Sequence, residues 1–166
     1  KNTFNFINQG FNLRPLDVSA SIAMSQLKRL KKMIKIRKFN RDMIIKLLKK
    51  SPKWDNQFTF FECNKNLKPS WFSIPLLINK RYLKFKNTYL KKLEKNKIET
   101  RPIISGNFIN QPAIKLHKLK FNKKKFKISQ DIEDRGFFIG LPTKKIKSKD
   151  FKKLTNYLLD FKKKNV

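Results

Sequence analysis

Residues 98–112, IETRPIISGNFINQP, combine a short apolar strand with a turn that is rich in side-chain amides. The guanidinium group of Arg101 is a planar fork of donors that suits a phosphate or a carboxylate. The amides of Asn107 and Gln111 can hydrogen-bond hydroxyl groups, and loops that face solvent carry function more often than cores do. The segment therefore predicts one wall of a site for a polar, anionic small molecule. Pro102 and Gly106 would equally suit a plain connection between two elements.

The sequence before this segment predicts a long helix over residues 16–50. Asp17 can cap its start, and Ser51-Pro52 can end it. Apolar residues recur at spacings of three and four, with lysines on the opposite side, so we expect this stripe to face the core. We also expect a bend near Phe39–Asn40. The stripe consists of Ile22, Ala23, Gln26, Leu27, Leu30 and Ile34, continued by Met43, Ile44, Leu47 and Leu48.

The remaining patterns predict short strands that alternate with helices. Strands are expected at residues 58–63, 71–78, 98–104 and 137–141, with Pro75 indicating an edge or a bulge. Helices are expected at residues 86–95, where Asn96 suits the left-handed closing position, and after Ser148, with one further helical turn at 129–134. Lysine-rich residues 115–127 are expected to form a loop. This order predicts an α+β fold in which a small sheet is covered by helices on one side.

Length and composition exclude several classes of protein. The 166 residues fit one domain or a piece of a larger protein, and the first residue is Lys1. No run of about 18 apolar residues is present, so we expect no membrane span. Cys63 is the only cysteine and His117 the only histidine. An internal disulfide is therefore excluded, and we expect no metal site.

The formal charge of +31 raises the question of a nucleic-acid partner. Seven of the 42 basic residues are arginine, which leaves 35 lysines spread along the whole chain. Nucleic-acid modules more often cluster arginine and interleave exposed aromatic residues for stacking. We therefore expect a solvated basic surface and no specific nucleic-acid binding. A basic RNA-binding protein stays open as a distant alternative.

Three motifs occur in a fixed order along the chain. They are GFNLRPLD at residues 10–17, running into ASIAMSQL at 20–27, then residues 98–112, and finally DRGFFIGL at 134–141. Together they resemble the C-terminal part of the DegT/StrS family of pyridoxal-phosphate-dependent sugar aminotransferases. The residues PSWF at 69–72, together with SGN at 105–107, look closest to the branch that modifies nucleotide-linked 4-keto-6-deoxyhexoses. Phe11 stands where this family usually has tyrosine, and Lys97 where it often has glycine.

The resemblance implies the small domain of a fold-type-I enzyme: a long connecting helix followed by a small, mainly antiparallel sheet covered by helices. Residues 1–50 would form the interface turn and the connecting helix, and residues 51–166 the C-terminal small domain. The cofactor-binding large domain, with the reactive lysine or histidine, would lie upstream, so this fragment alone would be inactive. Asn12 and Arg14 would contact pyridoxal phosphate held by the other subunit of a homodimer with shared active sites.

The resemblance also implies the substrate side of the site. Arg101, Ser105, Asn107 and Gln111 would contact the nucleotide sugar, although Arg101 could instead form a surface ion pair with Glu99. Gly136 and Gly140 would meet backbone requirements. The implied reaction is amination of the sugar with glutamate as donor, in cytoplasmic biosynthesis of surface polysaccharide or lipopolysaccharide. With histidine in place of the reactive lysine, the alternative is removal of the C3 hydroxyl by a 3-dehydratase.

Overall fold

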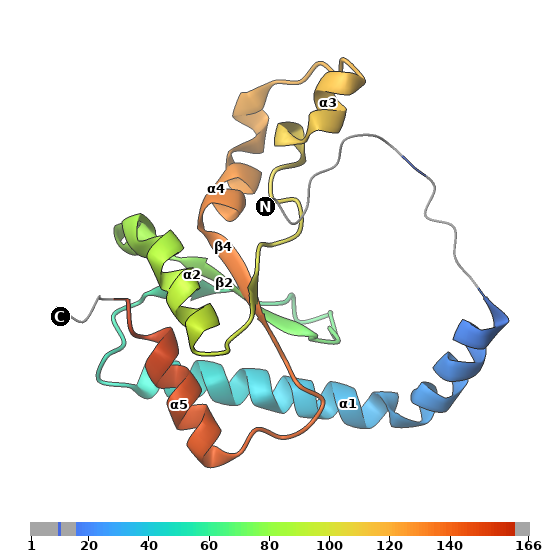
Figure 1. Cartoon of the computed structure of the whole chain (residues 1–166), viewed down its shortest axis with the longest axis vertical. Helices are drawn as coiled ribbons and strands as arrows, with labels where there is room; N and C mark the ends of the chain where they lie inside the picture. Colours follow the sequence, from blue (N-terminus) through green and yellow to red (C-terminus); the bar gives the residue numbers. More distant parts are fainter. Residues whose placement is uncertain (1–9, 11–15, 162–166) are drawn as a thin grey trace.

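The computed structural model describes residue 10 and residues 16–161, which form an α+β fold (Figure 1). A four-stranded sheet packs one face against a long N-terminal helix and two shorter helices. The helices are α1 (Asp17–Lys50), α2 (Lys86–Lys95), α3 (Pro112–Leu116), α4 (Lys127–Arg135) and α5 (Ser148–Leu158), and the strands are β1 (Phe58–Phe60), β2 (Ser73–Ile78), β3 (Thr100–Arg101) and β4 (Gly136–Gly140).

The sheet has the order β1-β2-β4-β3, and every neighbouring pair is antiparallel. Its buried residues alternate along the strands, as expected when one face meets the core. Ile74 and Leu76 of β2 and Phe137 of β4 are almost fully buried, whereas Pro75 and Phe138 on the other face are only partly covered. The buried face packs against α1, α2 and α5, so the prediction of helices on one side is confirmed.

Pro75 lies in an inner strand whose register with β4 has no bulge, so the prediction of an edge or a bulge is wrong. Pro75 is opposite Phe138 of β4. On its other side, β1 ends at Phe60, which is opposite Leu76, so the ladder stops one residue short of Pro75. A proline lacks the backbone N–H that such a ladder would need. The sheet therefore accommodates Pro75 by shortening its neighbour.

The helix α1 runs without interruption through Asn40, and the bend expected near Phe39–Asn40 stays a prediction. Asn40 is fully buried, and its side chain binds the segment between β4 and α5. Its Nδ2 donates to the carbonyls of Pro142 (3.1 Å) and Lys144 (2.9 Å), and its Oδ1 accepts from the N–H of Ile146 (3.2 Å). Asn40 therefore joins α1 to the β4–α5 connection.

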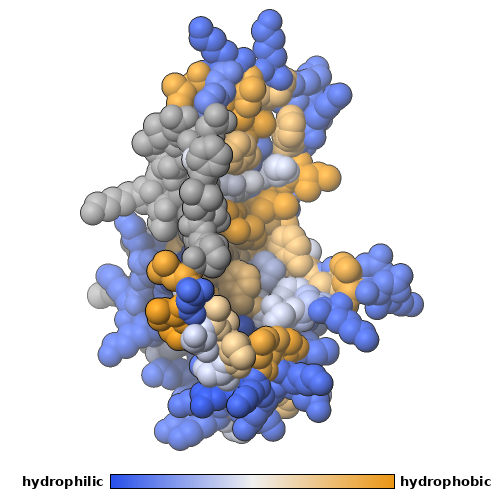
Figure 2. All heavy atoms as spheres, turned by 90° about the vertical axis from the view of Figure 1, so that its right-hand side faces the viewer, coloured by the Kyte–Doolittle hydropathy of each residue, from blue (hydrophilic) through white to orange (hydrophobic). Residues whose placement is uncertain are grey.

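The apolar stripe of α1 faces the core only in its second half. Ile44 and Leu48 are buried in the core, as predicted. In contrast, the exposed fractions of Ile22, Leu27 and Leu30 are 59%, 62% and 41%, so the prediction that they face the core is wrong for the described part of the chain. Viewed from the side on which α1 begins (Figure 2), apolar side chains gather along part of a hollow in the middle of this face.

The helix ends differ from the sequence predictions by single residues. Asp17 and Ser148 are the first residues of their helices instead of the caps, and neither Leu16 nor Lys147 before them makes a side-chain capping bond. At the end of α2, Lys97 (φ 61°) takes the left-handed position that was expected for Asn96. The N–H groups of Lys97 and Ile98 then bond to the carbonyls of Glu94 and Leu93, which is a Schellman motif.

Other differences lie around the sheet edges. The strands predicted at 58–63 and 98–104 shorten to β1 and β3. The single turn predicted at 129–134 is the longer helix α4. Residues 112–116, outside any predicted helix, form α3, with Ala113 and Ile114 buried. None of the described helices is long and apolar enough to cross a membrane.

Candidate functional site

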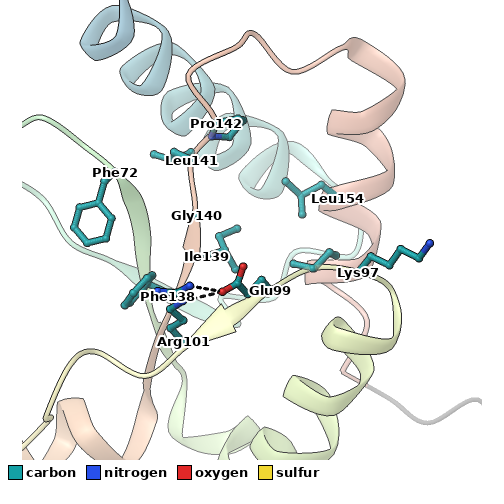
Figure 3. Close-up of a pocket in the computed structure, with 11 residues that line it drawn as sticks. Phe72, Lys97, Glu99, Arg101, Phe138, Ile139, Gly140, Leu141, Pro142 and Leu154 are labelled. Carbon is teal, nitrogen blue, oxygen red and sulfur yellow. Dashed lines mark hydrogen bonds and ion pairs between the residues drawn. The ribbon is translucent and has the colours of Figure 1, made fainter. Parts of the chain in front are cut away.

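A pocket of about 530 Å³ lies at the β3 edge of the sheet (Figure 3). It exists because β3 contains only two residues, and its pairing with β4 ends where Thr100 is opposite Ile139. Beyond this point, the end of β4 lacks a strand partner on that side. Phe72 lies on one side of this strand end and Leu154 of α5 on the other. The walls are mostly aromatic and aliphatic, with few charged groups.

Arg101 lines this pocket, and its guanidinium is engaged by a neighbouring carboxylate. Nε and Nη2 of Arg101 are 2.8 and 2.6 Å from Oε1 of Glu99. The ion pair that the sequence offered as an alternative is therefore present. Both side chains are more than half exposed, and exposed pairs of this kind contribute only about 0–1 kcal/mol. An anionic ligand could replace Glu99 as the partner at little cost, so substrate contact by Arg101 stays a prediction.

The two glycines of the last motif have different environments. A Cβ on Gly136 would lie 2.3 Å from the carbonyl oxygen of Ile132 and 2.7 Å from Cδ1 of Ile103, so glycine is a backbone requirement there, as predicted. At Gly140 no atom lies within 4 Å of the position of a Cβ. Crowding therefore does not explain Gly140, and the absence of a side chain leaves this part of the pocket open.

The other predicted substrate residues lie on the loop that follows β3, and they do not line the pocket beside Arg101. Asn107 is 2% exposed, and its Nδ2 donates to Oε1 of Gln130 (3.0 Å). Gln111 is also buried, and its Nε2 donates to the carbonyl of Ser105 (3.4 Å). The structure thus gives these amide donors partners within the protein, and contact with a substrate stays a prediction for all three loop residues.

Two residues that sequence reasoning missed hold this loop. Oε2 of Glu133 accepts from the N–H of Asn107 (2.9 Å) and from Nδ2 of Asn110 (2.8 Å). Oε1 of Gln130 accepts from the Nδ2 groups of both asparagines. The only signal in the sequence is the spacing of three between Gln130 and Glu133, which places them on one face of α4. Such spacing is common on exposed helices and indicates no particular partner.

A lysine joins the end of α4 to α2. Nζ of Lys86 donates to the carbonyls of Glu133 (3.2 Å) and Asp134 (2.6 Å). Burial lowers the pKa of Lys86, an effect that the nearby carboxylates of Asp134 and Glu133 oppose. The carbonyls at a helix C-terminus favour a cation, so Lys86 fixes the end of the helix that carries Gln130 and Glu133.

The predicted cofactor contacts Asn12 and Arg14 lie outside the described residues. Within residue 10 and residues 16–161, no three histidine, cysteine, aspartate or glutamate residues are arranged to hold a metal ion. The pocket beside β4 does not fit a phosphorylated pyridine on its own, because its arginine is paired with Glu99 and its other walls are largely apolar. The described part of the chain therefore builds no complete cofactor site.

Residues 1–158 match the DegT/DnrJ/EryC1/StrS aminotransferase family. Among curated proteins, GDP-4-keto-6-deoxy-D-mannose 3-dehydratase of Yersinia pseudotuberculosis is 30% identical over 144 residues, which are 83% of this chain and 34% of that protein. The protein of the same name from Escherichia coli O55:H7 is 30% identical over 112 residues, 68% of this chain and 27% of that protein. The lipopolysaccharide biosynthesis protein RfbH of Salmonella typhimurium is 28% identical over 110 residues, 66% of this chain and 24% of that protein. The chain thus spans about a third of these relatives or less.

Solved structures agree with this fold. A mutant of GDP-4-keto-6-deoxymannose-3-dehydratase (ColD) with bound GDP-perosamine superposes with a TM-score of 0.69 at 25% identity, covering 94% of this chain and 39% of that one. Helicobacter pylori PseC, an aminotransferase involved in the biosynthesis of pseudoaminic acid, superposes with a TM-score of 0.71 at 17% identity, covering 92% of this chain and 38% of that one. The described residues therefore have the fold of one part of these larger enzymes.

Proposed function

Because this chain belongs to the DegT/DnrJ/EryC1/StrS aminotransferase family, we propose that it is the C-terminal small-domain part of a pyridoxal-phosphate-dependent enzyme that acts on a nucleotide-linked 4-keto-6-deoxy sugar. One observation carries the proposal: two relatives that are 30% identical to this chain share a name that specifies such a substrate. The activity belongs to the whole protein, since the chain spans only a third of the length of these relatives or less.

The exposed first half of α1 supports this division of the protein. Ile44 and Leu48 lie in the same core as residues 51–161, so the interface segment ends inside α1, near Leu30. Ile22 and Leu27 then belong to a surface that contacts the cofactor-binding large domain. Contiguous exposed apolar surface on a water-soluble domain marks a contact site. The hollow in Figure 2 faces the side of the molecule on which α1 begins.

Of the two reactions, removal of the C3 hydroxyl has specific support, because both 30%-identical relatives are 3-dehydratases. The family description and the fold of PseC keep amination as the second candidate. The deciding residue is a lysine or a histidine at the reactive position, outside this chain. Glutamate would supply the amino group to the cofactor in either reaction.

Further parts of the proposal concern the assembly. Asn12 and Arg14 contact the cofactor phosphate across the interface of a homodimer with shared active sites. Asparagine and arginine are suitable donors for a phosphate. The enzyme acts in the cytoplasm, in the synthesis of surface polysaccharide, as the name of the RfbH relative suggests. Arg101 contacts the anionic part of the nucleotide sugar after release from Glu99.

The test is to express the full reading frame and supply pyridoxal phosphate, glutamate and GDP-4-keto-6-deoxy-D-mannose. Borohydride reduction followed by peptide mass spectrometry shows whether the cofactor becomes covalently fixed to a lysine. A histidine enzyme gives no such peptide and yields a 3-deoxy sugar, whereas a lysine enzyme yields an amino sugar. Failure to retain the cofactor would overturn the proposal. So would the absence of both products, the 3-deoxy sugar and the amino sugar.

A further inference from the structure

The loop that follows β3 has an unfavourable backbone conformation. Ile104 has φ 42°, a region that β-branched residues rarely enter. Its N–H donates to the carbonyl of Pro102 (2.8 Å), and the N–H of Gly106 donates to the carbonyl of Ile103 (2.9 Å). Such a residue costs about 1–3 kcal/mol and persists only where the surroundings impose it. Something outside the turn must therefore hold it.

The side chains of Glu133 and Gln130 supply that constraint from α4. Glu133 accepts two hydrogen bonds and Gln130 two more, all from Asn107 and Asn110. In turn, Nε2 of Gln130 donates to Oδ1 of Asp134 (2.9 Å), which fixes the orientation of the Gln130 amide. Hydrogen bonds to a carboxylate contribute more than neutral ones. The four bonds form a clamp, defined by Glu133, Gln130, Asn107 and Asn110.

The backbone approaches this clamp so closely that only glycine fits. A Cβ on Gly106 would lie 2.7 Å from both Cβ and Cγ of Glu133, and φ at Gly106 is 60°. The buried Oδ1 of Asn107 has no hydrogen-bond partner among the described residues. A buried acceptor without a partner costs about 1–3 kcal/mol. Both features show that the shape of the loop is maintained against local preference.

The clamp connects the loop to the pocket through the sheet. The loop begins at the end of β3, and α4 leads directly into β4. These two strands pair with each other, with Arg101 opposite Phe138. The position of the loop relative to the backbone of Arg101 is therefore fixed at both ends. Ile104 and Phe108 remain exposed on the outer side of the loop.

We infer that Glu133 and Gln130 are positioning residues that hold the loop of residues 103–111 in the conformation that receives the nucleotide sugar beside Arg101. The identity of the ligand rests on the proposed function. The existence of the clamp rests only on the four hydrogen bonds. Neither residue needs to contact the sugar. Release of the clamp would leave a loop that relaxes to a lower-energy backbone and must be reordered by each incoming substrate.

The experiment uses the full-length holoenzyme with three substitutions and one control. Glu133→Ala removes two acceptors, Glu133→Gln keeps the shape, and Gln130→Ala removes the second support. Glu94→Ala is the control, because Glu94 is an exposed glutamate on a helix away from the loop. Binding of GDP-perosamine is measured by calorimetry, turnover by product analysis, and loop order by hydrogen exchange at residues 103–111.

We expect Glu133→Ala to raise both the dissociation constant for GDP-perosamine and KM about tenfold, the equivalent of one lost charged hydrogen bond. Exchange should accelerate only in the loop, cofactor content and kcat should stay within about twofold, and Glu133→Gln should recover part of the binding. Gln130→Ala, which keeps the charge, should shift the same quantities less.

Two outcomes overturn the inference. Loop exchange in Glu133→Ala equal to that in Glu94→Ala would show that no clamp exists. Faster exchange with unchanged binding would show that the clamp does not serve the substrate. A wild-type holoenzyme that fails to bind GDP-perosamine would instead refute the proposed function, and the exchange comparison on the same samples would still show whether the clamp exists.

Discussion

Asn40 offers a direct test of how the β4–α5 connection is held. Its side chain makes three hydrogen bonds to the backbone of Pro142, Lys144 and Ile146, and its own exposure is 0%. Asn40→Ala removes all three. A hydrogen bond contributes about 1 kcal/mol net, so the loss is about 3 kcal/mol. The higher helix propensity of alanine returns about 0.5 kcal/mol. The expected destabilisation is therefore about 2–3 kcal/mol.

The assay is urea unfolding followed by helical circular dichroism, with Asp42→Ala as the control on the same helix. Asp42 is partly exposed and pairs with Lys38 and Arg41, so its loss should cost less than about 1 kcal/mol. A free energy of unfolding of Asn40→Ala within about 0.5 kcal/mol of the wild-type value would refute the reasoning. Water would then have replaced all three hydrogen bonds.

A second variant, Asn40→Asp, separates the donor from the acceptor. Its carboxylate keeps the bond from the N–H of Ile146 but faces the carbonyls of Pro142 and Lys144. We therefore expect a pKa above the ordinary value of aspartate in the folded protein. A raised folded pKa means that stability is lost as pH rises through that pKa and is regained at lower pH. A deficit relative to Asn40→Ala that grows on acidification would contradict this account.

Three further predictions concern the core, a helix end and the exposed stripe. Tyr89→Phe should cost about 1 kcal/mol, because the buried carbonyl of Leu158 loses its donor at 2.9 Å. Burial raises the pKa of Tyr89 well above 10.0, so stability should fall as pH rises past 10.0 in the wild type and fall less in Tyr89→Phe, as alkaline unfolding curves would show. Lys97→Gly should stabilise the protein by up to about 1 kcal/mol in thermal unfolding, since glycine adopts φ 61° without strain; a lower melting temperature would contradict it. Ile22→Ser and Leu27→Ser should leave the unfolding of the 166-residue chain unchanged but destabilise the full-length enzyme; equal effects in both would refute the proposed docking role of the stripe.

The sequence predicted those elements whose buried residues repeat over several turns or strand positions. Phe151 and Leu158 in α5 and Tyr89 and Leu93 in α2 follow such repeats and are buried. The same rule misplaced Ile22 and Leu27, because periodicity shows that a helix has an apolar face without showing what covers it. The helix α3 was missed because five residues give no measurable period. At the end of α2, the left-handed residue is Lys97 and not Asn96, because the bonds from Lys97 and Ile98 back to Glu94 and Leu93 require that conformation at position 97.

The candidate site shows why chemistry-bearing residues are harder to assign than elements. The amides of Asn107 and Gln111 suggested contacts with hydroxyl groups of a ligand, and the structure buries both with partners inside the protein. The partner of Asn107, Gln130, lies 23 residues away, and nothing local in either segment indicates the pairing. A polar side chain on a turn can serve a ligand or the turn itself, and only long-range geometry separates these roles. Here the geometry gives the buried amides partners that hold the loop, and their contact with a substrate stays a prediction. The exposed guanidinium of Arg101, paired weakly with Glu99, can exchange its partner for an anion.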